Sequence, residues 1–247
     1  MADPTLPAPF RWEGEHIRAD LPGAGVLFST RRGGVSPPPY ASLNLGRLTD
    51  DAGEHVDENR ERLAAAAGVP RERILYGRQV HGARVRRALE APSDSRPVAE
   101  EDGQATALPG MAALVFVADC LPIALAADGA VAAIHAGWPG LAAGIVAEGV
   151  AALREVGGAG PVSAAIGPGV AGCCYEVGEE VHEHFTGYDA RRGERNLDIA
   201  AVARAQLEAQ GVEVIDVALC TICDERFFSH RRDQGITGRQ AGVVCRA

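Results

Sequence analysis

Short apolar runs separated by polar turns dominate the middle of the chain. Residues 112–118 and 121–127 are almost continuously apolar, Asp128 and Gly129 follow, and a third apolar run occupies 130–134. Runs of this length, bounded by turn residues, are typical of buried strands. Because Asp-Gly between two such runs favours a two-residue turn, we predict a β-hairpin with this pair at its tip.

The predicted hairpin brings two candidate metal ligands onto one face. With Asp128 and Gly129 at the tip, His135 pairs with Pro122, and Cys120 lies one diagonal step from His135. Diagonal neighbours on adjacent strands are about 7–8 Å apart at the backbone, so their side chains can reach one small ion. Pro122 lacks an N–H group and therefore indicates a strand start, an edge or a bulge.

The remaining pattern predicts an irregular alternation of strands and helices. It indicates strands at 25–30, 162–166, 213–219 and 242–244, two short strand pieces within 74–85, and helices at 51–67, 141–156, 178–185 and 198–210. Gly68 is the expected stop of the first helix, Asp198 the expected N-cap of the last, and His81 lies between the two strand pieces. This order favours the α+β class, with mixed sheets flanked by helices, over a doubly wound parallel sheet.

Composition indicates a packed globular protein. Hydrophobic residues make up 47% of the 247 residues and charged residues 23%, which is ordinary globular usage. A chain of this length can form one core, and neither a repeat nor a linker divides it, so we expect a single domain over 1–247. The Pro-rich residues 1–10 are expected to form a flexible N-terminal segment.

Charge and apolar run lengths exclude several classes of partner. All 24 basic residues are Arg, against 33 acidic residues, and the formal net charge is −9. An acidic chain is poorly suited to nucleic acid, whose phosphates need a basic face. The apolar runs are far shorter than the roughly 20 residues of a membrane span, and the N-terminus has no apolar signal core. We therefore expect a cytoplasmic protein with no membrane partner and with its six Cys reduced.

Two His and one Cys form a donor set suited to zinc. His81, Cys120 and His135 together supply three ligands, which leaves the fourth position of a tetrahedral ion open for water or substrate. An open position is typical of catalytic zinc, which lowers the pKa of bound water or polarises a substrate group. Each of these residues alone would carry little weight, because most His and Cys residues are structural.

Motifs along nearly the whole chain resemble the laccase-domain, or YfiH-type, family, described as purine nucleoside phosphorylases and polyphenol oxidases. The matching segments, in family order, are TRRGGVSP at 30–37, YASLNLG at 40–46, RQVHG at 78–82, ADCLP at 118–122, IHAGW at 134–138, IGP at 166–168, CCYEVG at 173–178, NLD at 196–198, FFSHRRD at 227–233 and TGR at 237–239. The resemblance implies an α/β/β/α-type sandwich and a zinc ion held by His81, Cys120 and His135. It implies phosphorolysis of adenosine, inosine and methylthioadenosine, and deamination of adenosine.

Several polar residues within these motifs are candidates for the substrate site. An anionic co-substrate such as phosphate needs cationic donors, and the motifs contain Arg31, Arg32, Arg231, Arg232 and Arg239. Each of these is alternatively an ordinary solvated side chain. Asn44 could bind a ribose hydroxyl or cap a turn, and Gln79 could orient a ligand or pack beside it. Glu176 is a candidate acid or base, with an exposed carboxylate at a helix start as the alternative.

The chain departs from the family pattern at several positions. Pro139 stands where the family usually has Arg, and it suits the first turn of the following helix. Gly169 and Gly172 replace a Cys and a Pro, and His230 replaces a common Tyr. The metal triad is intact, so these departures bear on substrate affinity and preference.

Other functions compete with the phosphorylase interpretation. A copper polyphenol oxidase is the first, but this chain has seven His and one His-x-His pair, His182 and His184, which at helical spacing point to different faces. Copper at Cys120 is the alternative metal. The family resemblance also implies a second rival, a hydrolase editing peptidoglycan precursors, with Cys120 as nucleophile and His135 as base. A non-catalytic binding protein is a third.

The motif CTIC at 220–223 is a rival metal or redox site. Two Cys at this spacing can hold zinc or cycle between thiol and disulfide. The spacing pattern shows no second pair to complete a four-ligand site, and we therefore expect Cys220 and Cys223 to pack near the substrate pocket.

Overall fold

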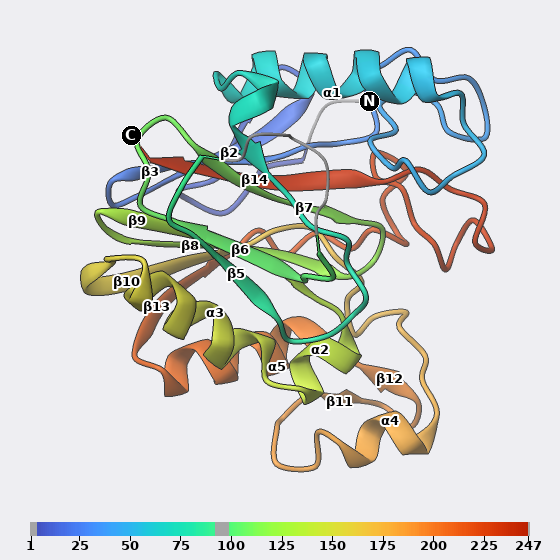
Figure 1. Cartoon of the computed structure of the whole chain (residues 1–247). Helices are drawn as coiled ribbons and strands as arrows, with labels where there is room; N and C mark the ends of the chain where they lie inside the picture. The colour runs from blue at the N-terminus through green and yellow to red at the C-terminus, as the bar shows by residue number, and fades with distance from the viewer. Residues whose placement is uncertain (1–3, 92–98, 247) are drawn as a thin grey trace.

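Two six-stranded sheets lie face to face at the centre of the protein (Figure 1). The structure is a computed structural model that describes residues 4–91 and 99–246. Helix α1 (Gly53–Ala67) covers the outer face of the first sheet. Helices α3 (Ile145–Glu155) and α5 (Ile199–Ala209) cover the outer face of the second. These four layers confirm the predicted α/β/β/α sandwich of the α+β class.

Both sheets are mixed. The first has the order β1 (Arg11–Glu13), β2 (His16–Leu21), β3 (Ala24–Phe28), β14 (Gln240–Arg246), β7 (Ala112–Val117) and β4 (Ile74–Leu75), with only the β4–β7 pair parallel. The second has the order β13 (Val212–Asp216), β10 (Ala159–Ile166), β8 (Leu121–Asp128), β9 (Ala130–Ala136), β6 (Gly103–Thr106) and β5 (Val85–Ala88), with β10–β13 and β5–β6 parallel. Smaller elements are the 3-10 turn Arg71–Arg73, α2 (Trp138–Ala142), α4 (Glu179–Glu183), and a ribbon of β11 (Arg191–Arg192) with β12 (Asn196–Leu197).

The β8–β9 hairpin has the predicted register. Asp128 and Gly129 form the tip, Gly129 has φ 84°, and Pro122 faces His135. Pro122 is the second residue of β8, and its missing N–H disrupts no bond to His135. The His135 N–H donates instead to the Asp102 carbonyl at 2.7 Å, and the Pro122 carbonyl accepts from the Gly167 N–H at 2.9 Å.

The second sheet is buried on both faces, which explains its continuous apolar runs. Along β8, Leu121, Ile123 and Leu125 pack towards the layer of α3 and α5. Ala124 and Ala126 alternate with them and pack towards the first sheet. Alanine is the commonest residue of this inter-sheet layer, to which Ala19, Ala24, Ala113, Ala133 and Ala165 also belong. The two sheets therefore meet through small side chains.

The helix expected at 141–156 is two helices, and that prediction was wrong. Gly144 adopts φ 91°, which ends α2 and begins α3 in a new direction. The apolar spacing continued across the break and concealed it. Pro139 lies in the first turn of α2, as expected. Gly68 (φ 69°) caps α1, and the Asp198 carboxylate accepts the Ala201 N–H at 3.0 Å to cap α5, both as predicted.

The segment formed by residues 4–12 packs on the inter-sheet layer. Phe10 is buried there, Leu6 lies against it, and the Trp12 indole N–H donates to the Pro4 carbonyl at 2.9 Å. Flexibility within residues 1–10 stays a prediction. Among the described residues, no helix is both long and apolar enough to cross a membrane.

A matched pair of leucines tests the helical layer. Leu153 in α3 is fully buried against the second sheet, whereas Leu89 is 66% exposed. We expect Leu153→Ala to lower the free energy of unfolding by about 2–5 kcal/mol, because it leaves a cavity, and Leu89→Ala to lower it by under about 0.5 kcal/mol. Urea denaturation of both variants measures this. Equal losses would contradict the packing described.

Candidate metal centre and substrate pocket

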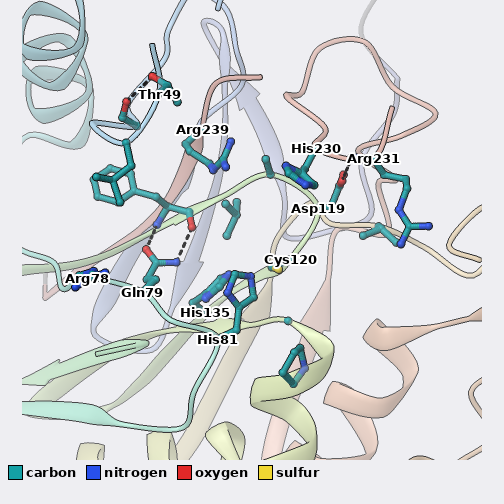
Figure 2. A pocket seen from close by; sticks show the side chains of 18 of the residues that line it. Thr49, Arg78, Gln79, His81, Asp119, Cys120, His135, His230, Arg231 and Arg239 are labelled. Atoms are coloured by element: carbon teal, nitrogen blue, oxygen red, sulfur yellow. Dashed lines mark hydrogen bonds between the residues drawn. The ribbon is translucent and has the colours of Figure 1, made fainter. Parts of the chain in front are cut away.

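The three residues expected to bind zinc converge at one point (Figure 2). His81 comes from the connection between β4 and β5, Cys120 immediately precedes β8, and His135 lies in β9. One ligand atom from each lies within 4.8 Å of the others, and the two imidazole rings are 4.8 Å apart at their centroids. The hairpin register supplies two ligands, and a loop distant in sequence supplies the third.

A buried carboxylate that sequence reasoning missed organises the centre. Asp102 is fully buried, and its Oδ1 accepts the His81 backbone N–H at 2.9 Å and lies 2.8 Å from His135 Nδ1. Its Oδ2 accepts the N–H groups of Val80 and Gly82 at 3.1 and 2.8 Å. One side chain thus holds the His81 turn, where His81 has φ 60°, and fixes the His135 ring. A carboxylate behind a ligating His is the usual orienting partner at metal sites.

Gly137 provides the space in which the ligands meet. A Cβ atom at this position would lie 2.8 Å from Cys120 Sγ and 3.1 Å from His81 Cδ2. Such contacts are too short, so any side chain here would displace the ligands. The glycine of the IHAGW motif is therefore explained by the close approach of backbone to the metal centre.

Electrostatics favour the ligating form of the thiol. Burial alone would raise the pKa of Cys120, but the charge and hydrogen bond of His135 and a hydrogen bond from His81 lower it. Burial would lower the pKa of His135, but Cys120 and Asp102 raise it. The thiolate is the form of Cys that binds metals. Donor chemistry, convergence and the Gly137 cradle all fit a single ion with three protein ligands.

The centre forms part of the wall of a cavity of about 630 Å³. That volume is within the range of small-molecule sites, about 300–1,000 Å³. Aromatic side chains line it, among them Tyr76, Phe116, Trp138 and Tyr175. Burial, followed by the charge of Cys120, raises the pKa of Tyr175 to about 12. The aromatic lining was not predicted, because nothing in the sequence distinguishes these four residues from ordinary residues of the hydrophobic core.

Two predicted arginines line the cavity. Arg239 points into it and is anchored by the carbonyls of Thr237 and Gly238 at 3.1 and 2.9 Å (Figure 2). Burial lowers the pKa of Arg239, and the negative Cys120 and Asp119 oppose the shift. Arg231 lies 5.2 Å from the Tyr175 ring centroid and donates to the Glu176 carbonyl at 3.0 Å.

Asp119 joins the metal centre to the Arg231 loop. It has φ 89°, lines the cavity and directly precedes Cys120. Its Oδ1 accepts the Thr221 hydroxyl at 2.7 Å and its Oδ2 accepts the Arg231 backbone N–H at 2.7 Å. Sequence reasoning missed this role, since only the fold brings 119 beside 221 and 231.

Five predicted site residues lie outside the cavity lining: Arg31, Arg32, Asn44, Glu176 and Arg232. Arg31 donates to the Ala41 carbonyl at 2.7 Å, Arg32 pairs with Glu15 at 3.7 Å, and Glu176 pairs with Arg195 at 3.6 Å. Arg232 donates to the carbonyls of Phe227 and Thr221 at 2.7 and 2.8 Å. The structure gives each of these side chains a partner within the protein, and their contact with a substrate stays a prediction.

Asn44 and Gln79 act on the backbone around the cavity. Asn44 is fully buried, and its Oδ1 accepts the N–H groups of Arg239 and Gly46, both at 2.9 Å. Gln79 lines the cavity, yet its amide is occupied, because it accepts from the Phe116 N–H at 2.8 Å and donates to the Phe116 carbonyl at 2.7 Å. Both residues therefore support the cavity wall. His230 and Pro139, two departures from the family pattern, also line it.

Comparison with known proteins identifies the family of this chain. The model of a family described as multi-copper polyphenol oxidoreductase laccase matches residues 25–247. The chain belongs to this family. Within the laccase-domain family, it is 42% identical over 229 residues to a purine nucleoside phosphorylase of Corynebacterium glutamicum, covering 88% of this chain and 92% of that protein. It is 39% identical over 234 residues to the purine nucleoside phosphorylase YfiH of Escherichia coli, covering 90% and 93%.

Solved structures of other bacterial proteins have the same fold. YlmD of Geobacillus stearothermophilus superposes with a TM-score of 0.87 at 34% identity, covering 97% of this chain and 99% of that one. A Neisseria meningitidis protein superposes with a TM-score of 0.82, also at 34% identity, covering 94% and 99%. The resemblance inferred from the motifs is confirmed.

Replacing the organising carboxylate tests the centre. We expect Asp102→Asn to weaken zinc affinity by about 10–100-fold, because the amide keeps the shape but loses the charge and one acceptor. Competition with a chromogenic chelator measures this. Glu101→Gln is the matched control, since Glu101 is a buried neighbour whose Oε2 has no hydrogen-bond partner. Equal affinity in Asp102→Asn and the parent protein would contradict the orienting role.

Proposed function

We propose that this protein is a zinc-dependent purine nucleoside phosphorylase, with adenosine, inosine and methylthioadenosine as substrates and adenosine deamination as a second activity. The observation that carries the proposal is the group of His81, Cys120 and His135 at the wall of a nucleoside-sized cavity. Its relatives at about 40% identity bear the name purine nucleoside phosphorylase, which supports the same reaction here. We place it in the cytoplasm, acting on small molecules without nucleic-acid or membrane partners.

Zinc is the proposed metal because the donors are two imidazoles and one thiolate. Such a set suits zinc, and three protein ligands are typical of catalytic rather than structural sites. A bound zinc ion would supply a Lewis acid facing the cavity. Copper is the alternative, since Cys and His bind it as well.

Phosphorolysis needs an anion held beside a nucleoside. A phosphate oxygen forms a bond to the ribose C1′, the bond from C1′ to the purine nitrogen breaks, and the purine leaves with the electron pair and takes up a proton. Arg239 is the best candidate for the phosphate contact, because its guanidinium points into the cavity and Asn44 fixes its backbone. Arg231 is the second cation. The aromatic lining suits the flat faces of a purine.

Pro139 lines the same cavity in place of the Arg usual in the family. The proposed phosphate site therefore has one guanidinium fewer than expected for a relative. We assign the phosphate contact to Arg239 and Arg231, although Arg47, Arg60 and Arg78 also line the cavity. Weaker phosphate binding than in relatives with Arg follows from this loss.

The copper oxidase and cysteine hydrolase alternatives each have one supporting observation. The family description names a multi-copper oxidase, but among the described residues only two groups could hold a metal: the triad, and the four cysteines Cys173, Cys174, Cys220 and Cys223. His182 is buried, with its Nε2 3.2 Å from the Arg195 carbonyl, whereas His184 is exposed. The thiolate of Cys120 beside His135 would suit a nucleophile and base, so the role of that sulfur must be tested directly.

The products formed from adenosine test the reaction. We expect the zinc-loaded protein to release adenine and ribose 1-phosphate only when phosphate is present, and to form inosine with or without it. Chromatography of the reaction at several phosphate concentrations separates these outcomes. Adenine release that is independent of phosphate would indicate a hydrolase and would overturn the phosphorylase assignment.

Substitution of one sulfur separates the metal ligand from the nucleophile. We expect Cys120→Ser to lose about one zinc ion per chain and all measurable phosphorolysis, because a three-ligand site depends on each donor. Elemental analysis and the adenosine assay are run on the same sample. A Cys120→Ser protein with undiminished zinc and no activity would instead support the thiol hydrolase.

A further inference from the structure

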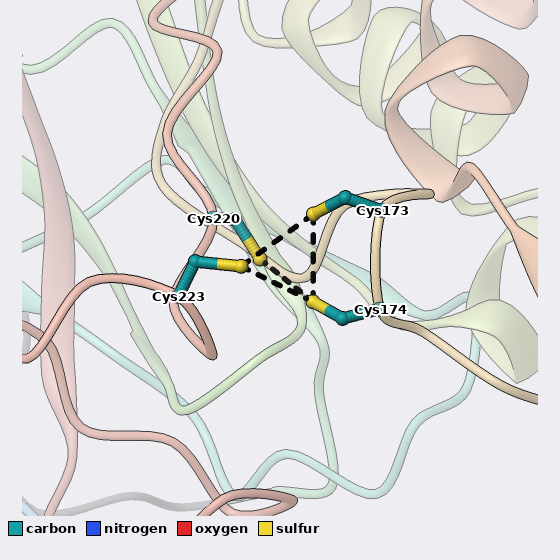
Figure 3. A group of neighbouring side chains, drawn as sticks. All are labelled: Cys173, Cys174, Cys220 and Cys223. Atoms are coloured by element: carbon teal, nitrogen blue, oxygen red, sulfur yellow. Dashed lines mark hydrogen bonds between the residues drawn. The ribbon is translucent and has the colours of Figure 1, made fainter.

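Four cysteines from two distant segments meet on the surface of the protein (Figure 3). Cys173 and Cys174 follow β10, whereas Cys220 and Cys223 follow β13. All four sulfur atoms lie within 4.8 Å of one another. The expectation that no second pair accompanies Cys220 and Cys223 was therefore wrong, because adjacent cysteines do not have the usual metal-ligand spacing in sequence.

The sulfur atoms surround a common centre instead of forming pairs. Cys174 Sγ lies 3.2 Å from Cys220 and 3.5 Å from both Cys173 and Cys223, and Cys173 lies 3.6 Å from Cys223. Sulfur ligands about 2.3 Å from a tetrahedral zinc ion are about 3.8 Å apart. Disulfide bonds would need two separate contacts of about 2.05 Å. Four of the six distances between these sulfurs lie between 3.2 and 3.6 Å, and all lie within 4.8 Å, which matches one central ion better than two bonds.

The backbone around the cluster stabilises negative sulfur. Burial would raise the pKa of Cys220, but N–H groups of Cys223, Ala171 and Ile222 donate to its sulfur and lower the pKa. Burial, followed by the neighbouring Cys220 and Cys223, raises the pKa of Cys173 and Cys174. Four thiols this close resist ionising together unless a cation lies between them. A divalent soft cation relieves that repulsion and deprotonates the ligands outright.

The cluster ties together two loops that form one side of the substrate cavity. The first loop, residues 167–178, contributes Val170 and Tyr175 to the lining, and the second, residues 217–233, contributes His230 and Arg231. A backbone bridge joins Gly169 to Cys220, and the Thr221 N–H donates to the Gly169 carbonyl at 3.0 Å. A cross-link at the cysteines would therefore hold Tyr175 and Arg231 in their mutual contact.

We propose that Cys173, Cys174, Cys220 and Cys223 form a second, structural zinc site that fastens these two loops together. Four protein ligands leave no open position, in contrast to the three ligands of the catalytic centre. The fully loaded protein then binds two zinc ions per chain, one at each centre. Zinc binding at the cluster stabilises the cavity wall without taking part in the reaction.

Counting zinc in matched variants tests the proposal. The reduced protein, loaded with zinc and freed of excess metal, is expected to hold two ions per chain. Cys120→Ser and the double variant Cys173→Ser, Cys223→Ser should each hold one. Cys245→Ser is the control, because Cys245 lies outside both clusters, and it should hold two. Cys173 and Cys223 are exposed, so their replacement leaves the core intact.

Spectroscopy assigns the ion to the cluster independently of activity. X-ray absorption at the zinc edge in Cys120→Ser should show a shell of sulfur alone, and zinc should raise the thermal midpoint of this variant. The double variant should lack the sulfur-only shell. Any of three results would overturn the proposal. These are one zinc ion per chain in the parent protein, a mixed shell of nitrogen and sulfur in Cys120→Ser, and a disulfide between these cysteines that mass spectrometry still detects after reduction.

Discussion

The two-residue turn at Asp128 and Gly129 sets the geometry on which the site depends. It fixes the register of β8 and β9, the central pair of the second sheet, and so places Cys120 beside His135. A slip of one residue would turn every side chain of one strand to the opposite face. It would carry His135 into the other core layer and separate the ligands. The apolar burial of both strand faces opposes such a slip.

The local parts of this architecture could be predicted from the sequence. The hairpin and the caps at Gly68 and Asp198 follow from short-range chemistry and periodicity, whereas the family motifs indicate the order of the layers and the triad. The break at Gly144 was hidden because the apolar spacing runs on across it. Asp102 and the cysteine cluster were not predicted, since each depends on contacts between segments far apart in the chain. No pattern within one segment reports such contacts.

The candidate substrate residues illustrate the same limit. Arg31, Arg232 and Asn44 stand in matched motifs, yet their hydrogen bonds hold loops together around the cavity. Arg239 stands in a similar motif and points into the cavity. Residue type and motif cannot separate these roles, because a guanidinium can donate to backbone carbonyls as well as to phosphate. Only the path of the backbone decides which partner it meets.

The alanine-rich layer between the sheets restricts how this sequence can drift over evolutionary time. Ala124, Ala126 and Ala133 come from the same two strands that carry the ligand pair, and they touch the opposite sheet. A larger side chain at any of them would push the sheets apart and tilt β8 against β9. Such a substitution survives selection only together with a second substitution that makes the facing side chain of the opposite sheet smaller. Paired substitutions here, in lineages that keep the metal ligands, are the expected evolutionary signature.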